Sequence, residues 1–204
     1  RSIRTNLQFA SIDHPITSLV ITSSGPSEGK SLTAANVATT FAQQGKKVLL
    51  VDADMRKPTV HYTFRIENTK GLSNYLIGEN KLEDITQETQ VENLYVITCG
   101  PIPPNPSEML SSKRMQQFVE EGKELFDLVI FDTPPVLAVT DPAIMSKYCD
   151  GVLLVIRSKA TEYEAAQKAK EQLEQVKANI LGVVLNDREQ KDSNYYYYYG
   201  TDKK

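Results

Sequence analysis

Tryptophan is absent from the 204-residue sequence, and cysteine and histidine occur only twice each. Cys99 and Cys149 do not form a disulfide framework or a metal-ligand spacing, so we expect two buried thiols in a reducing cytosol. His14 and His61 stand singly, with no partner pattern, and we expect both at the surface. The composition thus excludes a disulfide scaffold and a metal centre built from cysteine and histidine.

An excess of one charge and a long apolar run are missing as well. The chain has 23 Lys and Arg against 26 Asp and Glu, and this net charge of −3 argues against a general nucleic-acid binder. No apolar run approaches the roughly 18 residues that a membrane-spanning helix needs, and no signal peptide is recognisable. Because the chain begins at Arg1 rather than Met, we expect it to be part of a longer protein.

Apolar residues follow an order typical of one α/β domain. Continuous apolar runs predict buried strands near residues 19–21, 48–51, 94–98, 126–131, 151–156 and 180–185. Helical patterns separate the strands near residues 1–11, 32–42, 57–78, where the pattern is irregular, and 161–177. Two further helices are expected to begin at residues 106 and 141. Strands that are apolar on both faces and alternate with helices predict a doubly wound, mostly parallel sheet flanked by helices.

Two of these helices begin with residues that favour capping. Asn105 precedes Glu108 by three residues, with Pro106 at the first helical position. Thr161 stands three residues before Glu164 in the same way. We expect both pairs to cap the helices that follow them.

A small-residue loop after the first strand is the most informative stretch. It ends in Gly-Lys-Ser and leads into a helix, which is the arrangement of a phosphate-binding loop. The strict motif has glycine at position 24, where this chain has Ser24, and a chance Gly-Lys-Ser in a surface loop is the alternative. The residues expected to bind ATP are Gly25, Pro26, Ser27, Glu28, Gly29, Lys30, Ser31 and Leu32.

Polar residues end the other strands at the edge where a parallel sheet binds ligands. Asp132 ends the strand near 126–131, and a carboxylate there beside a phosphate loop holds Mg²⁺ directly or through water. Asp52 and Asp54 follow the second strand, where one could face the metal and the other take a proton. The alternatives are a turn cap for Asp132 and a solvated acidic turn for the other two. Arg56, next along, could contact phosphate or a neighbouring subunit, or belong to a solvated turn.

Taken together, the phosphate loop, the Val48 to Arg56 segment and the Leu128 to Asp132 segment resemble the bacterial tyrosine kinases of capsular-polysaccharide synthesis. The likeness is greatest to the CapB-type cytoplasmic kinases of Gram-positive bacteria, whose fold is the P-loop fold of the MinD and ParA proteins. The resemblance implies that Lys30 and Ser31 bind phosphates and Mg²⁺ and that Asp54 and Asp132 organise the water shell of the metal. It also implies that Asp52 is the base that activates the acceptor tyrosine. Asn186 is similar to an adenine-contacting asparagine of related folds, although a plain turn residue is nearly as good an interpretation.

The ends of the chain complete the resemblance. The five consecutive tyrosines Tyr195, Tyr196, Tyr197, Tyr198 and Tyr199 would be autophosphorylation sites in a flexible tail, residues 191–204, after a kinase domain of residues 1–190. Arg1 and Arg4 match the two arginines of a ring-assembly motif, E-x-x-R-x-x-R, whose glutamate would precede residue 1. The family further implies a homo-oligomeric ring, a membrane-spanning activator, a cognate phosphatase, protein substrates and a place at the inner face of the membrane.

Two other functions compete with a kinase. A MinD- or ParA-type ATPase switch shares the fold, but it carries a lysine near the start of the loop, where this chain has Gly25. It also needs an amphipathic or basic segment for membrane or DNA, and this chain ends in tyrosines. A nucleotide-binding scaffold without turnover is disfavoured because Lys30, Asp52 and Asp132 are all present.

Overall fold

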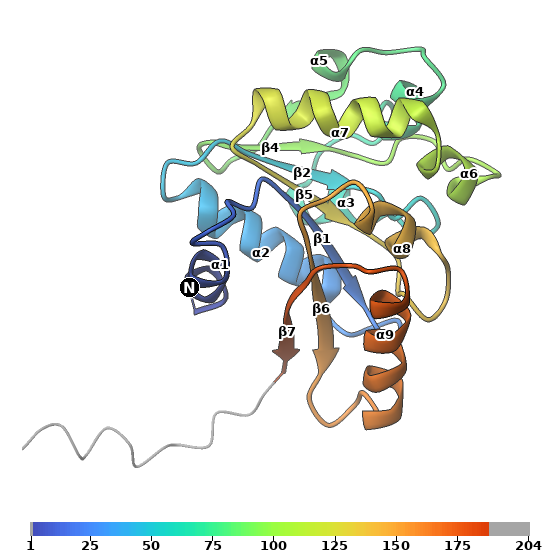
Figure 1. The fold of residues 1–204 in the computed structure, drawn as a ribbon. Helices are drawn as coiled ribbons and strands as arrows, with labels where there is room; N and C mark the ends of the chain where they lie inside the picture. Colours follow the sequence, from blue (N-terminus) through green and yellow to red (C-terminus); the bar gives the residue numbers. More distant parts are fainter. Residues whose placement is uncertain (1, 188–204) are drawn as a thin grey trace, which may run out of the picture.

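The computed structural model describes residues 2–187 of the chain (Figure 1). Its centre is a seven-stranded sheet with the strand order β3-β4-β2-β5-β1-β6-β7. The strands are β1 (Ser18–Ser23), β2 (Val48–Asp52), β3 (Gln87–Glu88), β4 (Leu94–Ile97), β5 (Leu128–Asp132), β6 (Gly151–Arg157) and β7 (Ile180–Asn186). The helices are α1 (Ser2–Ala10), α2 (Lys30–Ala42), α3 (Val60–Phe64), α4 (Leu72–Leu76), α5 (Leu82–Ile85), α6 (Pro106–Leu110), α7 (Lys113–Leu125), α8 (Asp141–Ser146) and α9 (Tyr163–Gln175).

All strand pairs are parallel except β3 with β4, which confirms the predicted doubly wound, mostly parallel sheet. The three central strands β2, β5 and β1 are buried along their whole length, which is why their sequences are continuously apolar. The register pairs Asp52 with Asp132 across β2 and β5, and Ile21 with Asp132 across β1 and β5. The carboxyl ends of the three strands therefore meet at one edge.

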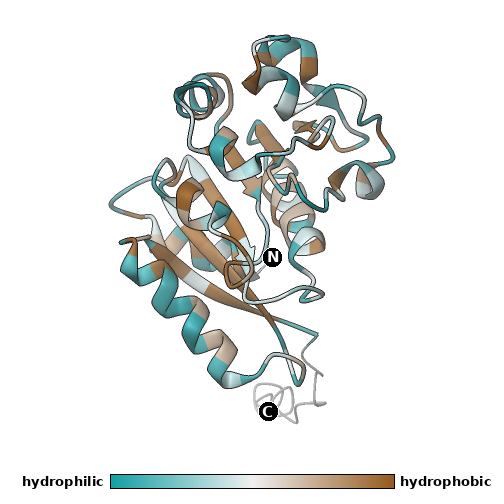
Figure 2. Ribbon diagram, turned by 90° about the vertical axis from the view of Figure 1, so that its right-hand side faces the viewer, coloured by the Kyte–Doolittle hydropathy of each residue, from teal (hydrophilic) through white to brown (hydrophobic). Residues whose placement is uncertain are grey.

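The sheet separates two hydrophobic cores (Figures 1 and 2). Successive residues of β2 point to opposite faces of the sheet, so that Val48 and Leu50 join one core while Leu49 and Val51 join the other. Helices α1 and α2 cover the first core, and α7, α8 and α9 cover the second. Both faces of the sheet are thus covered by helices. The polar residues at the carboxyl ends of the strands remain available to form a functional site.

Several local predictions differ from the structure. The irregular helix expected at 57–78 is two short helices, α3 and α4, and the helix expected after 105 is divided into α6 and α7. Helix α9 begins at Tyr163, and the Thr161 hydroxyl accepts a hydrogen bond from the Arg157 N–H instead of capping it. The Asn105 amide donates to the Glu108 carboxylate at 2.9 Å, so this pair bonds side chain to side chain and caps no backbone group. The helix start expected at Asn105 is confirmed, with Pro106 as the first residue of α6, but the side-chain capping predicted for both pairs was wrong because nearby polar groups compete for the same side chains.

The rare residues lie mainly as expected. Cys99 is buried and Cys149 half-buried, neither is in a disulfide, and burial raises the pKa of both thiols to about 12. His14 is exposed, but His61 is half-buried, and burial lowers its pKa. Within residues 2–187, no helix is both long enough and apolar enough to cross a membrane.

Candidate active site

The phosphate loop joins β1 to α2 through a backbone that only certain residues can adopt. Gly29, just before α2, has a φ of 77°, in the left-handed region that favours glycine. A Cβ atom at this position would also lie 1.8 Å from the Asn186 amide nitrogen, which donates a hydrogen bond to the Glu28 carbonyl at 3.2 Å. The left-handed backbone therefore favours glycine here, a Cβ would also displace the Asn186 side chain, and Asn186 at the end of β7 contacts the loop directly.

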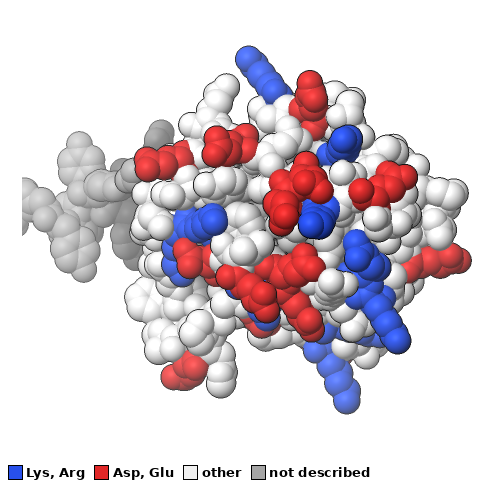
Figure 3. Space-filling view, turned by 90° about the horizontal axis from the view of Figure 1, so that it is seen from above, with Lys and Arg blue, Asp and Glu red and all other residues white. Residues whose placement is uncertain are grey.

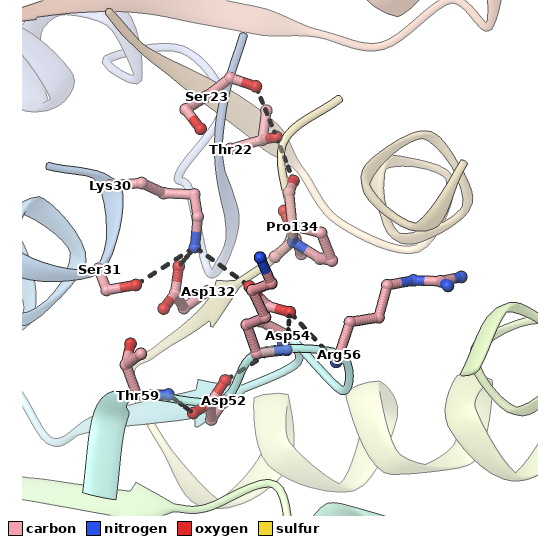
Figure 4. Close-up of polar contacts among 12 residues, drawn as sticks. Thr22, Ser23, Lys30, Ser31, Asp52, Asp54, Arg56, Thr59, Asp132 and Pro134 are labelled. Carbon is pink, nitrogen blue, oxygen red and sulfur yellow. Dashed lines mark hydrogen bonds and ion pairs between the residues drawn. The ribbon is translucent and has the colours of Figure 1, made fainter. Parts of the chain in front are cut away.

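Lys30, the first residue of α2, points into the space between the strand ends (Figure 4). Its ammonium nitrogen lies 2.5 Å from the Asp132 Oδ1 atom, 3.3 Å from the Ser31 hydroxyl and 3.9 Å from the Asp54 Oδ2 atom. The lysine is only 8% exposed. The phosphate loop after β1 and the end of the neighbouring strand β5 are thus joined by one buried ion pair.

Asp132 keeps one oxygen free in this buried place. The residue is 1% exposed, and its Oδ2 atom has no hydrogen-bond partner among the described residues. Burial raises the pKa of Asp132, while the Lys30 ammonium and the Ser31 hydroxyl oppose that rise. An unpaired buried carboxylate oxygen beside a serine hydroxyl suits a hard cation such as Mg²⁺, which takes few protein ligands and keeps several waters. Ser31 and Asp132 therefore fit the metal role that the resemblance implies.

Asp52 accepts hydrogen bonds from three backbone N–H groups. Its Oδ1 atom accepts from the Asp54 N–H at 3.1 Å, and Oδ2 accepts from Thr59 and Val60 at 3.0 Å each. The side chain is fully buried, and its burial, together with the nearby Asp132, raises the pKa of Asp52 to about 8. A carboxylate offers about four acceptor positions, so one remains to take a proton.

Asp54 turns toward the lysine. Its Oδ1 atom accepts from the N–H groups of Arg56 at 3.2 Å and Lys57 at 3.0 Å, which leaves Oδ2 facing Lys30. Asp52 and Asp54 thus point in different directions (Figure 4), although residues two apart on an extended strand share a face, because β2 ends at Asp52 and Asp54 lies beyond it. The solvated acidic turn is wrong for both residues, since Asp54 is only 7% exposed.

Arg56 belongs to a cluster that the sequence did not reveal. Its guanidinium forms a two-pronged ion pair with Asp141, with Nε 3.1 Å from Oδ2 and Nη2 3.2 Å from Oδ1. Nη2 also donates to the Ser107 hydroxyl at 3.0 Å, and this hydroxyl donates to Asp141 at 2.7 Å. The segments after β2, β4 and β5 are therefore tied together at the catalytic edge. Arg56 does lie in an exposed bend, but its guanidinium is bound to the buried Asp141, which could be suspected from the sequence only as the acidic first residue of a helix.

Of the remaining predicted site residues, two are described by the structure and the others lie outside the described residues. Leu32 lies in the first turn of α2 and is 59% exposed, beside the loop residues named above. Arg4 lies on α1 and is half-buried. Arg1 and the tyrosines Tyr195 to Tyr199 lie outside the described residues, so their predicted roles stay predictions.

A strand-loop-helix with a buried lysine, a hydroxyl and converging strand-end carboxylates defines a P-loop nucleotide-binding protein. The family described as "AAA domain" matches residues 20–186. The tyrosine-protein kinase YwqD of Bacillus subtilis is 52% identical over 98% of this chain and 85% of its own length. The tyrosine-protein kinase CpsD of Streptococcus agalactiae is 43% identical over 91% of this chain and 79% of its own length. The chain belongs to the family of bacterial tyrosine-protein kinases.

Solved structures agree with this assignment. The kinase domain of the Escherichia coli tyrosine kinase ETK superposes with a TM-score of 0.90 at 38% identity, over 95% of this chain and 76% of that one. The septum-site-determining protein MinD of Pyrococcus horikoshii, solved with Mg-ADP, has a TM-score of 0.71 at 22% identity, over 85% of this chain and 72% of that one. The second likeness shows the shared fold alone. The predicted resemblance to capsule-type tyrosine kinases is confirmed, and the chain is a kinase rather than a MinD-type switch.

Proposed function

We propose that this kinase transfers the γ-phosphoryl group of ATP to the tyrosines of its own tail, Tyr195 to Tyr199, in a neighbouring copy within a ring. The observation that carries the proposal is the convergence of Lys30, Asp54 and Asp132 beside the phosphate loop. Phosphoryl transfer depends mostly on positioning and charge stabilisation, which this arrangement supplies. Through this reaction the protein regulates the synthesis and export of a capsular or extracellular polysaccharide.

The residues of the site divide the work. Lys30 leaves Asp132 when phosphates enter the loop and binds their oxygens, while the N–H groups at the start of α2 bind the same anion. Ser31 and Asp132 would hold Mg²⁺, with Asp54 on its water shell, and the ion would supply positive charge against the charge that develops on the phosphates. Asn186, next to Gly29, borders the site on the β7 side. In this proposal it contacts the adenine ring of ATP.

Asp52 acts as the general base toward the acceptor tyrosine. A base is most effective when its pKa lies near the working pH, and burial raises the pKa of Asp52 to about 8. The three N–H donors fix the carboxylate in one orientation, with one acceptor position left for the phenol proton. Asp52 therefore serves the chemical step, whereas Asp132 serves metal binding.

Helix α1 offers a surface for assembly. It carries Arg4, and the apolar Phe9 at its end is 69% exposed, as is Ile12 just beyond it at 71%. Contiguous exposed apolar patches mark interaction sites, and we propose that these side chains contribute to one. With Arg1 they form the docking surface for the next copy in the ring.

The partners follow from the same reaction. The kinase works in the cytoplasm at the inner face of the membrane, bound to the cytoplasmic tail of a membrane-spanning activator. A cognate tyrosine phosphatase reverses its product, and further proteins are substrates. Acidic and basic side chains are interspersed on the face in Figure 3, which supports a protein partner over nucleic acid.

A mixing experiment tests transfer between copies. A Lys30→Met protein with an intact tail is incubated with ATP, Mg²⁺ and an active protein whose five tail tyrosines are phenylalanine. Label on the dead protein's tail, at a rate that rises with concentration, is the expected result. An unlabelled tail, while the wild-type protein labels itself at a rate independent of concentration, contradicts transfer between copies and assigns it to one chain.

A further inference from the structure

The Glu28 side chain crosses the phosphate loop and binds the residues that open it. Its Oε1 atom accepts from the Ser24 hydroxyl at 2.5 Å and from the Gly25 N–H at 3.1 Å. Its Oε2 atom accepts from the Ser24 N–H at 3.3 Å. Three donors thus converge on one carboxylate, which is 8% exposed.

The position of Ser24 gives this contact its meaning. The strict phosphate-loop motif has glycine there, and a glycine has no hydroxyl to donate. In this chain the departure from the motif and the carboxylate four residues later form one bonded pair. The serine is therefore part of a contact across the loop and not merely a tolerated small residue.

The loop also holds one residue in a sparsely populated backbone conformation. Ser27 has a φ of 61°, and a non-glycine residue in the left-handed region is strained, whereas Gly29 adopts its φ of 77° freely. The Glu28 carbonyl is fixed separately by the Asn186 amide at 3.2 Å. Glu28 is thus anchored by its side chain at the opening of the loop and by its backbone at the end of β7.

We infer that Glu28 and Ser24 form a strut that holds the phosphate loop open for nucleotide before any nucleotide binds. Glu28 is a positioning residue in this account. Its carboxylate engages the N–H groups of residues 24 and 25, whereas the phosphates are bound at the helix end of the loop beside Lys30. The inference rests on the proposed function, since it assumes that the loop binds ATP.

The opposite reading makes a distinct prediction. A carboxylate beside the phosphate site repels phosphates, and if Glu28 obstructed the loop its removal would strengthen binding. If the strut preorganises the loop, its removal weakens nucleotide binding even though a repulsive charge is lost. The loop would then have to become ordered when the nucleotide binds, and this ordering costs affinity.

Equilibrium binding of a fluorescent ADP analogue in Mg²⁺ separates these cases. Ser24→Gly restores the strict motif yet removes the hydroxyl, and Ser24→Ala removes the same hydroxyl without adding backbone freedom. We expect both to weaken binding about 3- to 10-fold, as loss of one hydrogen bond of typical net strength predicts. Glu28→Ala is expected to weaken it about tenfold, and Glu28→Gln, which keeps an acceptor, to restore most of the loss.

A double variant decides whether the two side chains act through each other. Ser24→Ala added to Glu28→Ala is expected to cost less than twofold, because its partner is already gone. Tighter binding by Glu28→Ala, unchanged binding by both Ser24 variants, or full additivity would each overturn the strut. If wild-type protein bound no nucleotide at all, the proposed function would fail first and the strut with it. Thermal unfolding of each variant checks that it is folded.

Discussion

Replacement of Arg56 by methionine is expected to reduce both stability and Mg²⁺-dependent activity. Asp141 is fully buried and is held by the two guanidinium contacts and the Ser107 hydroxyl. Removing one partner of a buried ion pair costs about 3–5 kcal/mol, because a charge is left uncompensated. The Arg56 side chain is 39% exposed and Ser107 remains, so we discount this to about 2–3 kcal/mol.

Loss of the Arg56 side chain is also expected to affect Mg²⁺ binding, because the backbone of this segment orients Asp54. The Arg56 and Lys57 N–H groups orient the Asp54 carboxylate, and the side chain of Arg56 anchors this segment to α6 and α8. Loss of such an outer contact typically reduces metal affinity or activity about 10- to 100-fold. The Arg56→Met variant should therefore need more Mg²⁺ for half-maximal activity.

Urea unfolding and thermal unfolding measure the first effect. A loss of 2–3 kcal/mol lowers the melting temperature by about 4–12 °C in a chain of this size. Lys170→Met is the matched control, because its ion pair with Glu174 on α9 is about half exposed on both sides and is worth about 0–1 kcal/mol. If Arg56→Met were as stable as Lys170→Met, with unchanged Mg²⁺ dependence, the reasoning would be refuted.

Four further substitutions test the account. Lys30→Met should abolish tail phosphorylation and leave the fold intact, as judged by circular dichroism, because phosphate binding and charge stabilisation are lost; normal phosphorylation would contradict the loop assignment. Asp52→Asn should reduce turnover more than nucleotide affinity, whereas Asp132→Asn should weaken Mg²⁺-dependent binding; equal losses of affinity would remove the separation of roles. Burial raises the pKa of Asp150, but hydrogen bonds from Thr17 and the Lys123 charge outweigh it, so the folded pKa is lowered. Its contribution to stability is thus present above about pH 4 and lost as pH falls through the folded pKa, so the stability difference from Asp150→Ala should shrink in acid unfolding measurements.

The sheet could be predicted because its central strands are buried on both faces. Full burial makes β1, β2 and β5 continuously apolar, and this pattern survives without any knowledge of the neighbours. The short elements could not be predicted in this way. Strand β3 has only two residues, and α4 and α5 have five and four, so tertiary contacts decide them rather than any periodic pattern.

The site was predictable where residues follow strands and not where distant segments meet. Asp52 and Asp132 end neighbouring parallel strands, so topology alone brings them together. The contact of Arg56 with Asp141 joins residues 85 positions apart and depends on where two loops turn. The pairing of Ser24 with Glu28 is local, and the signal was present in the sequence as a departure from the strict motif.

The most direct test of the central claim is to map phosphate on the tail. Wild-type protein is incubated with Mg²⁺ and ATP, with and without the cytoplasmic segment of its activator, and the peptide containing Tyr195 to Tyr199 is analysed by mass spectrometry. A kinase that acts on its own tail adds about 80 Da per modified tyrosine, more in the presence of the activator segment, and adds none in the Lys30→Met protein. A tail that remains unmodified under both conditions, in a protein that binds ATP, would contradict the account.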